Sequence, residues 1–278
     1  MVNKSFGMQP ATQYLSVPGG RVGYDVRGDG PLVALLPGMG ELRSSYRFLV
    51  EPLVAAGHRV VTVDLRGHGD SDATFTSYGD VETASDITAL MQQLGEPAVL
   101  VGNSMSAGSA VIVAAQHPEL VDGLVLVGPF VRNPVSGNAF LRLAFRALMA
   151  RPWVAAAWNA YLPTLYSGRK PEDFSAYRVA MIAAMKRPGY AAAFSRTTRT
   201  DHAQAENSLA SVHTPTLVVM GTKDPDFKDP AAEADWIAGV LDASVAMIDD
   251  AGHYPQSQQP EATADAVIEF LASVQRRA

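Results

Sequence analysis

The sequence predicts an α/β fold: a mainly parallel eight-stranded sheet with helices on both faces, plus a helical insertion. Two observations predict it. Short apolar runs alternate with stretches of helical period before residue 130 and again after residue 213, as in parallel strands joined by right-handed helical crossovers. Residues 130–213 lose this alternation and are helical in period, with several prolines. We therefore expect a core domain, residues 1–129 and 214–278, that carries a helical subdomain, residues 130–213.

The individual elements follow from the same pattern. The first two strands flank Pro18-Gly19-Gly20 and are expected to form an antiparallel hairpin, and the next four are unbroken apolar runs typical of buried parallel strands. The predicted strands are Gln13–Val17, Arg21–Arg27, Leu32–Leu36, Arg59–Val63, Ala98–Val101, Leu124–Val127, Thr216–Met220 and Ser244–Ile248. The predicted core helices are Ser44–Ala56, Val81–Leu94, Met105–Gln116, Ala231–Leu241 and Glu261–Ser273.

The composition excludes several classes of protein. The 278 residues include 22 Lys and Arg against 28 Asp and Glu, a formal charge of −6, which does not fit a nucleic-acid binder. No cysteine is present, so disulfides, thiolate metal sites and a cysteine nucleophile are excluded. The N-terminus has no apolar core of a signal peptide, and no apolar run approaches the roughly 18 residues of a membrane span. We expect a soluble, cytoplasmic protein that acts on a small molecule without metal or cofactor, and its oligomeric state stays open.

Basic residues are concentrated in the insertion. Residues 130–213 hold eleven Lys and Arg against four Asp and Glu, so the rest of the chain carries the acidic excess. The simpler interpretation is a basic insertion attracted to an acidic core, with most of its arginines solvated. The alternative is that Arg196 or Arg199 contacts an anionic or carbonyl-rich substrate.

The strongest functional signal is the segment Val101–Gly108. It joins a buried strand to a helix rich in Ala, Val and Ile, and Ser104 lies at the turn. A serine in this strand-turn-helix context is held out over the carboxyl edge of the sheet, and the positions two before and two after it, Gly102 and Ser106, must be small. Ser104 could instead only cap the following helix, but the context favours a nucleophile.

A serine nucleophile needs a base and an acid, and both follow at later strand ends in the order Ser, Asp, His. Asp224 follows the strand Thr216–Met220, and His253 lies in a loop after the strand Ser244–Ile248. Asp226 is the rival acid, although it could instead cap the next helix, and Asp224 is favoured because it lies nearer the strand end. The other five histidines have no such setting, and no pair of them has a metal-ligand spacing.

Four motifs in this order make the chain similar, over nearly its whole length, to the α/β-hydrolase-fold superfamily, in particular to lid-bearing serine hydrolases of the esterase and lactonase type. Leu36–Gly40 resembles the oxyanion loop of the family, with Pro37 where a histidine is common. Asp64–Ser71 resembles the turn after the next strand. The serine turn, with Ser106 where glycine is usual, and the Asp–His pair are the other two.

The resemblance implies the roles of further residues. The N–H groups of Met39 and Met105 would form the oxyanion hole of a Ser–His–Asp triad enzyme. Residues 130–213 would be the lid that covers the pocket and sets substrate choice. The candidate substrate-binding side chains are Phe130, Trp158, Met181 and Tyr254. They would make the pocket apolar and adaptable, although such residues could also only pack on one another.

The predicted function is hydrolysis of an ester, lactone or related carbonyl bond of a small, largely apolar molecule, through an acyl-enzyme on Ser104. The serine argues against dehalogenases and epoxide hydrolases of this fold, which use an aspartate. Cofactor-free haloperoxidases and carbon–carbon bond hydrolases keep the same three residue types and are alternatives. A ligand sensor or signalling protein that retains the triad and turns over slowly is another.

Overall fold

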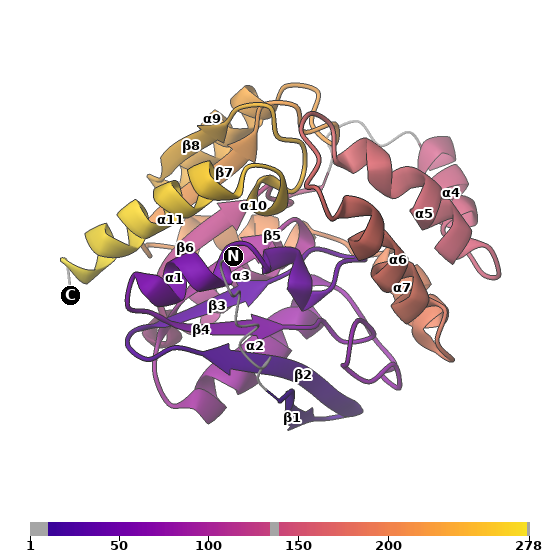
Figure 1. Cartoon of the computed structure of the whole chain (residues 1–278), viewed down its shortest axis with the longest axis horizontal. Helices are drawn as coiled ribbons and strands as arrows, with labels where there is room; N and C mark the ends of the chain where they lie inside the picture. The colour runs from indigo at the N-terminus through magenta and orange to yellow at the C-terminus, as the bar shows by residue number, and fades with distance from the viewer. Residues whose placement is uncertain (1–10, 134–138, 277–278) are drawn as a thin grey trace, which may run out of the picture.

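The computed structural model describes residues 11–133 and 139–276. In this part of the chain eight strands form one sheet in the order β1-β2-β4-β3-β5-β6-β7-β8 (Figure 1). They are β1 (Gln13–Val17), β2 (Gly20–Arg27), β3 (Leu32–Leu36), β4 (Arg59–Val63), β5 (Ala98–Asn103), β6 (Val121–Val127), β7 (Thr216–Gly221) and β8 (Ser244–Ile248). β2 pairs antiparallel with β1 and β4 and the other neighbours are parallel, so the predicted mainly parallel sheet is confirmed. The prediction about a signal peptide concerns residues outside the described range.

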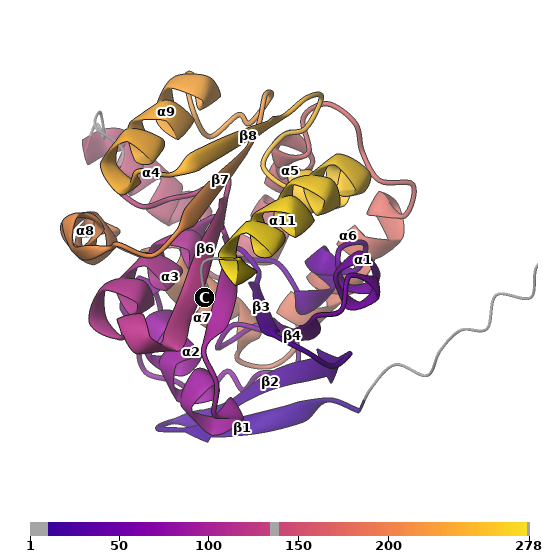
Figure 2. The same ribbon diagram turned by 90° about the vertical axis from the view of Figure 1, so that its left-hand side faces the viewer.

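Helices cover both faces of the sheet because its central strands are apolar towards both sides. β3 and β5 are buried at every position, as expected for unbroken apolar runs. On one face, α2 (Asp80–Leu94), α3 (Met105–Gln116) and α9 (Pro230–Leu241) share a buried apolar cluster with the strands. On the other face, α1 (Val50–Ala55) and α11 (Pro260–Gln275) form a second cluster (Figure 2). The sheet is therefore the middle layer of three.

The helix predicted at Ser44–Ala56 is divided in two. Arg43–Tyr46 forms a 3₁₀ turn, and α1 begins only at Val50. Pro52 explains the late start, because proline lacks an N–H and is tolerated only in the first turn of a helix. The other predicted core elements end within three residues of the observed ones. None of the helices in the described residues combines the length and the apolar character that crossing a bilayer requires.

A helical segment separates β6 from β7 in the described residues. Its helices are α4 (Ala139–Leu148), α5 (Val154–Leu165), α6 (Phe174–Met185), α7 (Tyr190–Thr197) and α8 (Ala203–Ser208). α5, α6 and α7 lie beside the sheet (Figure 1) and share an apolar cluster that includes Trp158, Phe194 and Tyr254. α8 lies elsewhere: it packs on the face of the sheet that α3 covers, where Ala205 is fully buried.

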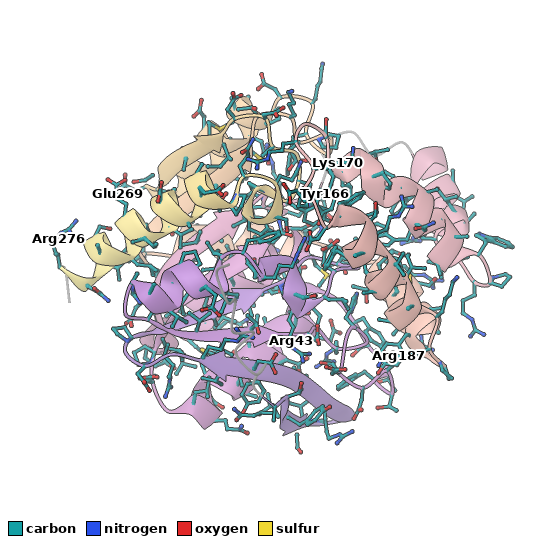
Figure 3. The ribbon with its side chains drawn as sticks, viewed as in Figure 1. Arg43, Tyr166, Lys170, Arg187, Glu269 and Arg276 are labelled. Carbon is teal, nitrogen blue, oxygen red and sulfur yellow. The ribbon has the colours of Figure 1, made fainter. Side chains whose placement is uncertain are left out.

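Side chains fasten this segment to the core at the loop after β3 and at the loop after β8. Arg47 donates two hydrogen bonds to the Asp173 carboxylate, at 2.6 and 2.5 Å. Tyr166 is buried at the junction (Figure 3), and its ring stacks on that of Tyr254 with centroids 4.7 Å apart. The segment is therefore anchored at both of these loops.

The backbone after α5 is joined still more closely to the core. Leu165 O accepts a hydrogen bond from His253 N–H, and Asp250 O accepts one from Arg169 N–H, both at 2.9 Å. Gln258, in the short helix α10 (Pro255–Gln258), donates from Nε2 to Arg169 O at 2.7 Å. The loop that carries His253 and the end of α5 therefore form one hydrogen-bonded unit.

Arg43, which is labelled in Figure 3, holds three acidic residues together. Its guanidinium bonds to Asp25 at 2.7 Å, to Asp70 at 2.9 Å and also to Asp64. The Asp64 side chain is only 1% exposed, so its charge depends on this partner. Arg43 thereby joins β2, the loop after β3 and the loop after β4.

We predict that Arg43→Met lowers the free energy of unfolding by about 3 kcal/mol, because it leaves the buried Asp64 carboxylate without its cation. Urea denaturation measures the loss. The control is Arg27→Met, which removes an arginine paired with Glu51, a residue with a 70% exposed side chain, and should cost far less. Equal losses in the two variants would contradict the prediction.

Candidate active site

Ser104 lies in a strained turn between β5 and α3. Its φ of 57° and ψ of −122° are rare for a residue with a side chain and cost about 1–3 kcal/mol. The hydrogen bond from Ser104 N–H to Val127 O on β6, 2.9 Å long, holds the turn. Gly102 makes it possible, because a Cβ at that position would lie 2.5 Å from Ser106 O. The turn presents Ser104 at the carboxyl edge of the sheet.

A hydroxyl ties the loop after β3 to this turn. Ser106 Oγ donates to Pro37 O at 2.6 Å, a bond that glycine, the usual residue in the family, could not make. At Gly38 a Cβ would lie 3.1 Å from Ser104 Cβ, so the loop passes directly beside the serine. Met39, the next residue of the loop, and Met105, the first residue of α3, line the same cavity as Ser104. The first N–H groups of a helix lack intrahelical partners and can donate to an anion.

His68 positions this loop, and the sequence does not predict this role for it. Gly40 N–H donates to His68 Nε2 at 3.0 Å, and His68 Nδ1 lies 3.0 Å from Arg66 O. His68 is buried, and burial lowers its pKa. The ring is therefore neutral, with Nδ1–H donating to Arg66 O and Nε2 accepting from Gly40, a tautomer that follows from its two partners.

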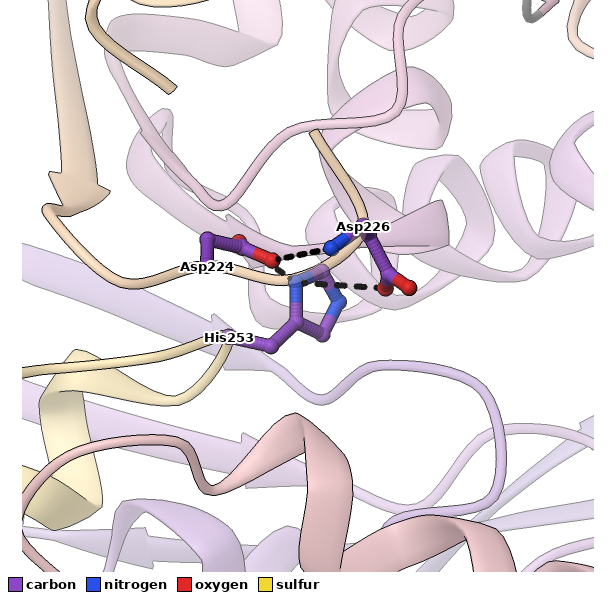
Figure 4. Close-up of side chains that lie close together, drawn as sticks. All are labelled: Asp224, Asp226 and His253. Carbon is purple, nitrogen blue, oxygen red and sulfur yellow. Dashed lines mark hydrogen bonds and ion pairs between the residues drawn. The ribbon is translucent and has the colours of Figure 1, made fainter. Parts of the chain in front are cut away.

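His253 is paired with Asp224. Its Nδ1 lies 2.8 Å from Asp224 Oδ2 and 3.6 Å from Asp226 Oδ2 (Figure 4). Asp224 Oδ1 accepts a bond from Asp226 N–H at 3.0 Å, whereas the Asp226 carboxylate accepts one from the Tyr161 hydroxyl at 2.9 Å. Asn103 Nδ2 donates to His253 O at 3.2 Å, which links the histidine loop to the end of β5. Of the two acids that the sequence offered, Asp224 therefore makes the hydrogen bond.

Opposing effects set the charge of His253. Burial lowers the pKa of His253. The carboxylates of Asp224 and Asp226 raise it, and together they outweigh the effect of burial, so the pKa lies at about 9 instead of 6.5. Asp226 is affected in the reverse sense: burial raises the pKa of its carboxyl, and the charge of His253 lowers it. The raised pKa of His253 favours the charged ring, and only the neutral ring can act as a base.

A cavity of about 330 Å³ lies beside Ser104, which is within the range of small-molecule sites. Of the predicted substrate-binding residues, Phe130, Trp158 and Tyr254 line it. Met181 does not, because the apolar side of α6 packs onto the other inserted helices and leaves this side chain 1% exposed within their cluster. The described residues that line the cavity are Met39, Ser104, Met105, Phe130, Phe145, Trp158, Tyr161, Leu165, Thr197, Thr198, Thr200, His202, Asp226, His253 and Tyr254.

His202 and its partner Asp80 were not predicted from the sequence. His202 lines the cavity, and its Nδ1 lies 2.7 Å from Asp80 Oδ2 although 122 residues separate the two. Neither residue belongs to a motif, and such a pairing across two loops leaves no local pattern. The hydroxyl-bearing neighbours Thr197, Thr198 and Thr200 also line this wall.

The arginines proposed as substrate contacts lie elsewhere. Arg196 and Arg199 are exposed and do not line the cavity. Arg132, at the start of the insertion, is bonded to Glu233 of the core at 2.5 Å. These positions favour the simpler interpretation, in which the insertion and the core attract each other.

Asp224, Asp226 and His253 also have the composition of a metal site, since one ligand atom of each lies within 4.8 Å of the others. The hydrogen bond from His253 to Asp224 argues against it. Nδ1 would have to lose both its proton and this partner before it could bind a cation. The cluster therefore fits an acid–histidine pair better than a metal site.

Comparison with known proteins gives consistent matches. A family model described as "Alpha/beta hydrolase family" matches residues 33–266. The chain is 29% identical over 271 residues to 2-(acetamidomethylene)succinate hydrolase of Mesorhizobium japonicum, covering 91% of this chain and 92% of the relative. It is 28% identical over 265 residues, 89% and 90% of the two chains, to 2-hydroxy-6-oxononadienedioate/2-hydroxy-6-oxononatrienedioate hydrolase 2 of Pseudomonas putida. A solved thermophilic esterase from Thermogutta terrifontis, with malate bound, has a TM-score of 0.81 and 26% identity, covering 95% and 99%.

We predict that the His253 imidazole titrates above its ordinary value of 6.5, towards a pKa of about 9. Asp226→Asn removes one of the carboxylates that favour the charged ring, so it should move the midpoint to lower pH. Histidine ring signals followed by NMR over a pH series measure both midpoints. Glu119→Gln, which removes a carboxylate outside the cavity, should leave the midpoint in place. A wild-type midpoint at or below 6.5 would refute the prediction.

Proposed function

The chain belongs to the alpha/beta hydrolase family, and on that premise we propose that it is a serine hydrolase that cleaves an ester, lactone or related carbonyl bond. One observation carries the proposal. Ser104, in its strained turn, lines the same cavity as His253, and His253 is bonded to the buried carboxylate of Asp224. A hydroxyl becomes a nucleophile when a neighbouring base, itself oriented by an acid, removes its proton.

In the proposed acylation step, Ser104 Oγ attacks the carbonyl carbon of the substrate while His253 Nε2 accepts the hydroxyl proton. Asp224 holds the ring with Nδ1–H towards its carboxylate, so that Nε2 is free to accept. The tetrahedral intermediate then collapses, the bond to the leaving group breaks, and His253 returns the proton to that group. The acyl group remains on Ser104.

The oxyanion of this intermediate is proposed to lie against the N–H groups of Met39 and Met105. Their two segments are joined by the hydrogen bond from Ser106 to Pro37 O, which keeps the spacing of the donors fixed. A single donor of this kind contributes roughly 2.7–4 kcal/mol of transition-state stabilisation in serine hydrolases. His68, through Gly40, restrains the same loop.

Deacylation repeats the chemistry with water. His253 removes a proton from a water molecule, which attacks the acyl carbon, and the same proton returns to Ser104 as the acid leaves. The raised pKa of His253, about 9, implies that the rate increases with pH through this value, because only the neutral ring can accept a proton.

The substrate is proposed to be a small molecule with a largely apolar body. A cavity of about 330 Å³ between Phe130, Trp158 and Tyr254 supports this size and character. We propose that residues 130–213 act as the lid of this pocket and residues 1–129 and 214–278 as the core domain. Two relatives are named for carboxylate-bearing compounds, a substituted succinate and a dienedioate, which suggests that polar groups of the substrate are also recognised.

Carbon–carbon bond hydrolysis is the second candidate, and one finding favours it. The Pseudomonas putida relative is named for a 2-hydroxy-6-oxo compound, in which the carbonyl is a ketone rather than an ester. The same serine, base and oxyanion donors could act on such a carbonyl. Turnover of a 2-hydroxy-6-oxo-2,4-dienoate in preference to esters would select this candidate.

We predict that the wild-type protein hydrolyses at least one of 4-nitrophenyl acetate, butyrate and octanoate with saturable kinetics, and that Ser104→Ala lowers kcat/KM by at least about a thousandfold. Release of 4-nitrophenol measures the rate, and equal thermal unfolding midpoints show that the variant is folded. Undiminished activity in Ser104→Ala would overturn the proposal. A single burst equal to the enzyme concentration would favour a slow-turnover sensor.

We predict that Asp224→Asn lowers kcat by about ten-thousandfold, because an amide no longer holds the histidine tautomer that can accept the serine proton. Asp226→Asn should have a much smaller effect on kcat, since its carboxylate does not bond to Nδ1. The same 4-nitrophenyl ester assay compares them. The larger loss in Asp226→Asn would instead identify Asp226 as the triad acid.

A further inference from the structure

One wall of the cavity carries a second histidine–carboxylate pair. His202, just before α8, has its Nδ1 2.7 Å from Oδ2 of Asp80, the first residue of α2. The His202 ring stacks on Phe130, with centroids 5.6 Å apart and planes at 26°. His253 meets the same Phe130 ring edge-on at 5.8 Å. The two histidines therefore lie against one aromatic side chain.

Burial of the Asp80 carboxyl is energetically unfavourable. The Asp80 side chain has no exposed surface, and its Oδ1 has no hydrogen-bond partner within the described ranges. Burial raises the pKa of this carboxyl, while the bond to His202 and the charge of His202 lower it. An ion pair that served stability alone could be replaced by apolar residues of similar volume at little or no loss. A ligand-binding role accounts for keeping the pair at the cavity wall.

Because Asp80 occupies Nδ1, the nitrogen that His202 can offer a ligand is Nε2. The neighbouring hydroxyls are already used: Thr197, Thr198 and Thr200 donate to backbone carbonyls at 3.1, 2.9 and 2.6 Å. Among the described residues that line the cavity, His202 and His253 alone have basic side chains. With His253 bonded to the triad acid, His202 is the basic side chain that remains for a ligand.

We propose that His202, held by Asp80, binds a carboxylate of the substrate, so that the preferred substrate is a short-chain ester or related carbonyl compound with a second, anionic carboxyl group a few carbons from the carbonyl that is attacked. This inference rests on the hydrolase function proposed above and specifies its substrate class. An imidazole N–H that donates to a carboxylate forms a charge-assisted hydrogen bond, because the acceptor is ionised, and such a bond is stronger than one between neutral groups. Since both histidines contact Phe130, a chain of a few carbons spans them.

Asp226 is the charged group of the cavity that opposes an anion. It lies 3.6 Å from His253 Nδ1 and accepts a bond from Tyr161, so its charge is at the triad. A substrate carboxylate is therefore repelled near the triad and can accept a hydrogen bond at His202 Nε2. This charge arrangement orients the substrate with its uncharged carbonyl at Ser104 and its carboxylate at His202.

The experiment compares two esters of equal length, monoethyl glutarate and ethyl 5-oxohexanoate, which end in a carboxylate and in a methyl ketone. The readout is the ratio of their kcat/KM values, measured by acid release in a pH-stat. His202→Gln keeps an amide donor but removes the basic ring, and we expect it to lower the ratio by at least about tenfold. Asp80→Asn should lower it as well, and if that variant fails to fold, His202→Gln decides.

The matched control is His117→Gln. His117 lies after α3, 3.4 Å from Glu119, and does not line the cavity, so the ratio should not change. A ratio that falls in His202→Gln and not in the control supports the carboxylate site. An unchanged ratio in His202→Gln, an equal fall in the control, or a wild-type protein that hydrolyses the ketone ester and not the carboxylate ester would overturn it.

Failure of the hydrolase function itself has a different signature. In that case neither ester is hydrolysed by the wild-type protein in a manner that depends on Ser104. Calorimetric titration with glutarate then tests the carboxylate site independently of turnover. Binding to the wild-type protein that weakens at least about tenfold in His202→Gln supports the site, and absence of binding to the wild-type protein overturns it.

Discussion

The left-handed backbone at Ser104 is the constraint on which the rest of the site depends. A residue with a side chain stays at a φ of 57° only where its surroundings leave no alternative. At Ser104 the surroundings are β5, which is buried at every position, and the tightly packed start of α3. The sheet register places Leu36 beside Gly102 and Asn103 beside Val127. The loop after β3 is therefore brought to this turn by strand pairing, and the hydrogen bond from Asn103 Nδ2 to His253 O links the loop after β8 to the end of β5.

The sequence predicts those parts of the protein whose causes are local. Unbroken apolar runs identify β3 and β4 to the residue, and small residues around Ser104 identify its turn, because both reflect the burial of a short segment. Non-local causes leave no such trace. The apolar period at Ser44–Ala56 predicts one continuous helix, whereas α1 begins only at Val50, two residues before Pro52. Met181 is a residue type that often lines apolar pockets, but the direction in which its side chain points depends on how α6 packs.

Charge shows the same division between local and non-local causes. The excess of arginine in the insertion is visible in the sequence, yet none of its described members lines the cavity, and Arg132 is bonded to Glu233 of the core. The basic side chains that line the cavity in the described residues are histidines instead, each oriented by an acid that is distant in the chain: His253 by Asp224, 29 residues away, and His202 by Asp80, 122 away. Buried ionisable groups of this kind depend on partners that only the fold supplies.

The hydrogen bonds between the end of α5 and the loop after β8 restrain one end of the inserted segment more than the other. Leu165 and His253 share a backbone bond, so displacing this end of the segment would also displace the proposed base. Among its described residues, α4 has no hydrogen bond to the histidine loop; Phe145 lines the cavity and is 36% exposed, and Leu148 is 50% exposed. A substrate that entered, or a product that left, on the side of α4 would therefore not disturb the histidine loop. One end of the segment would then admit ligands, while the other end keeps His253 in place.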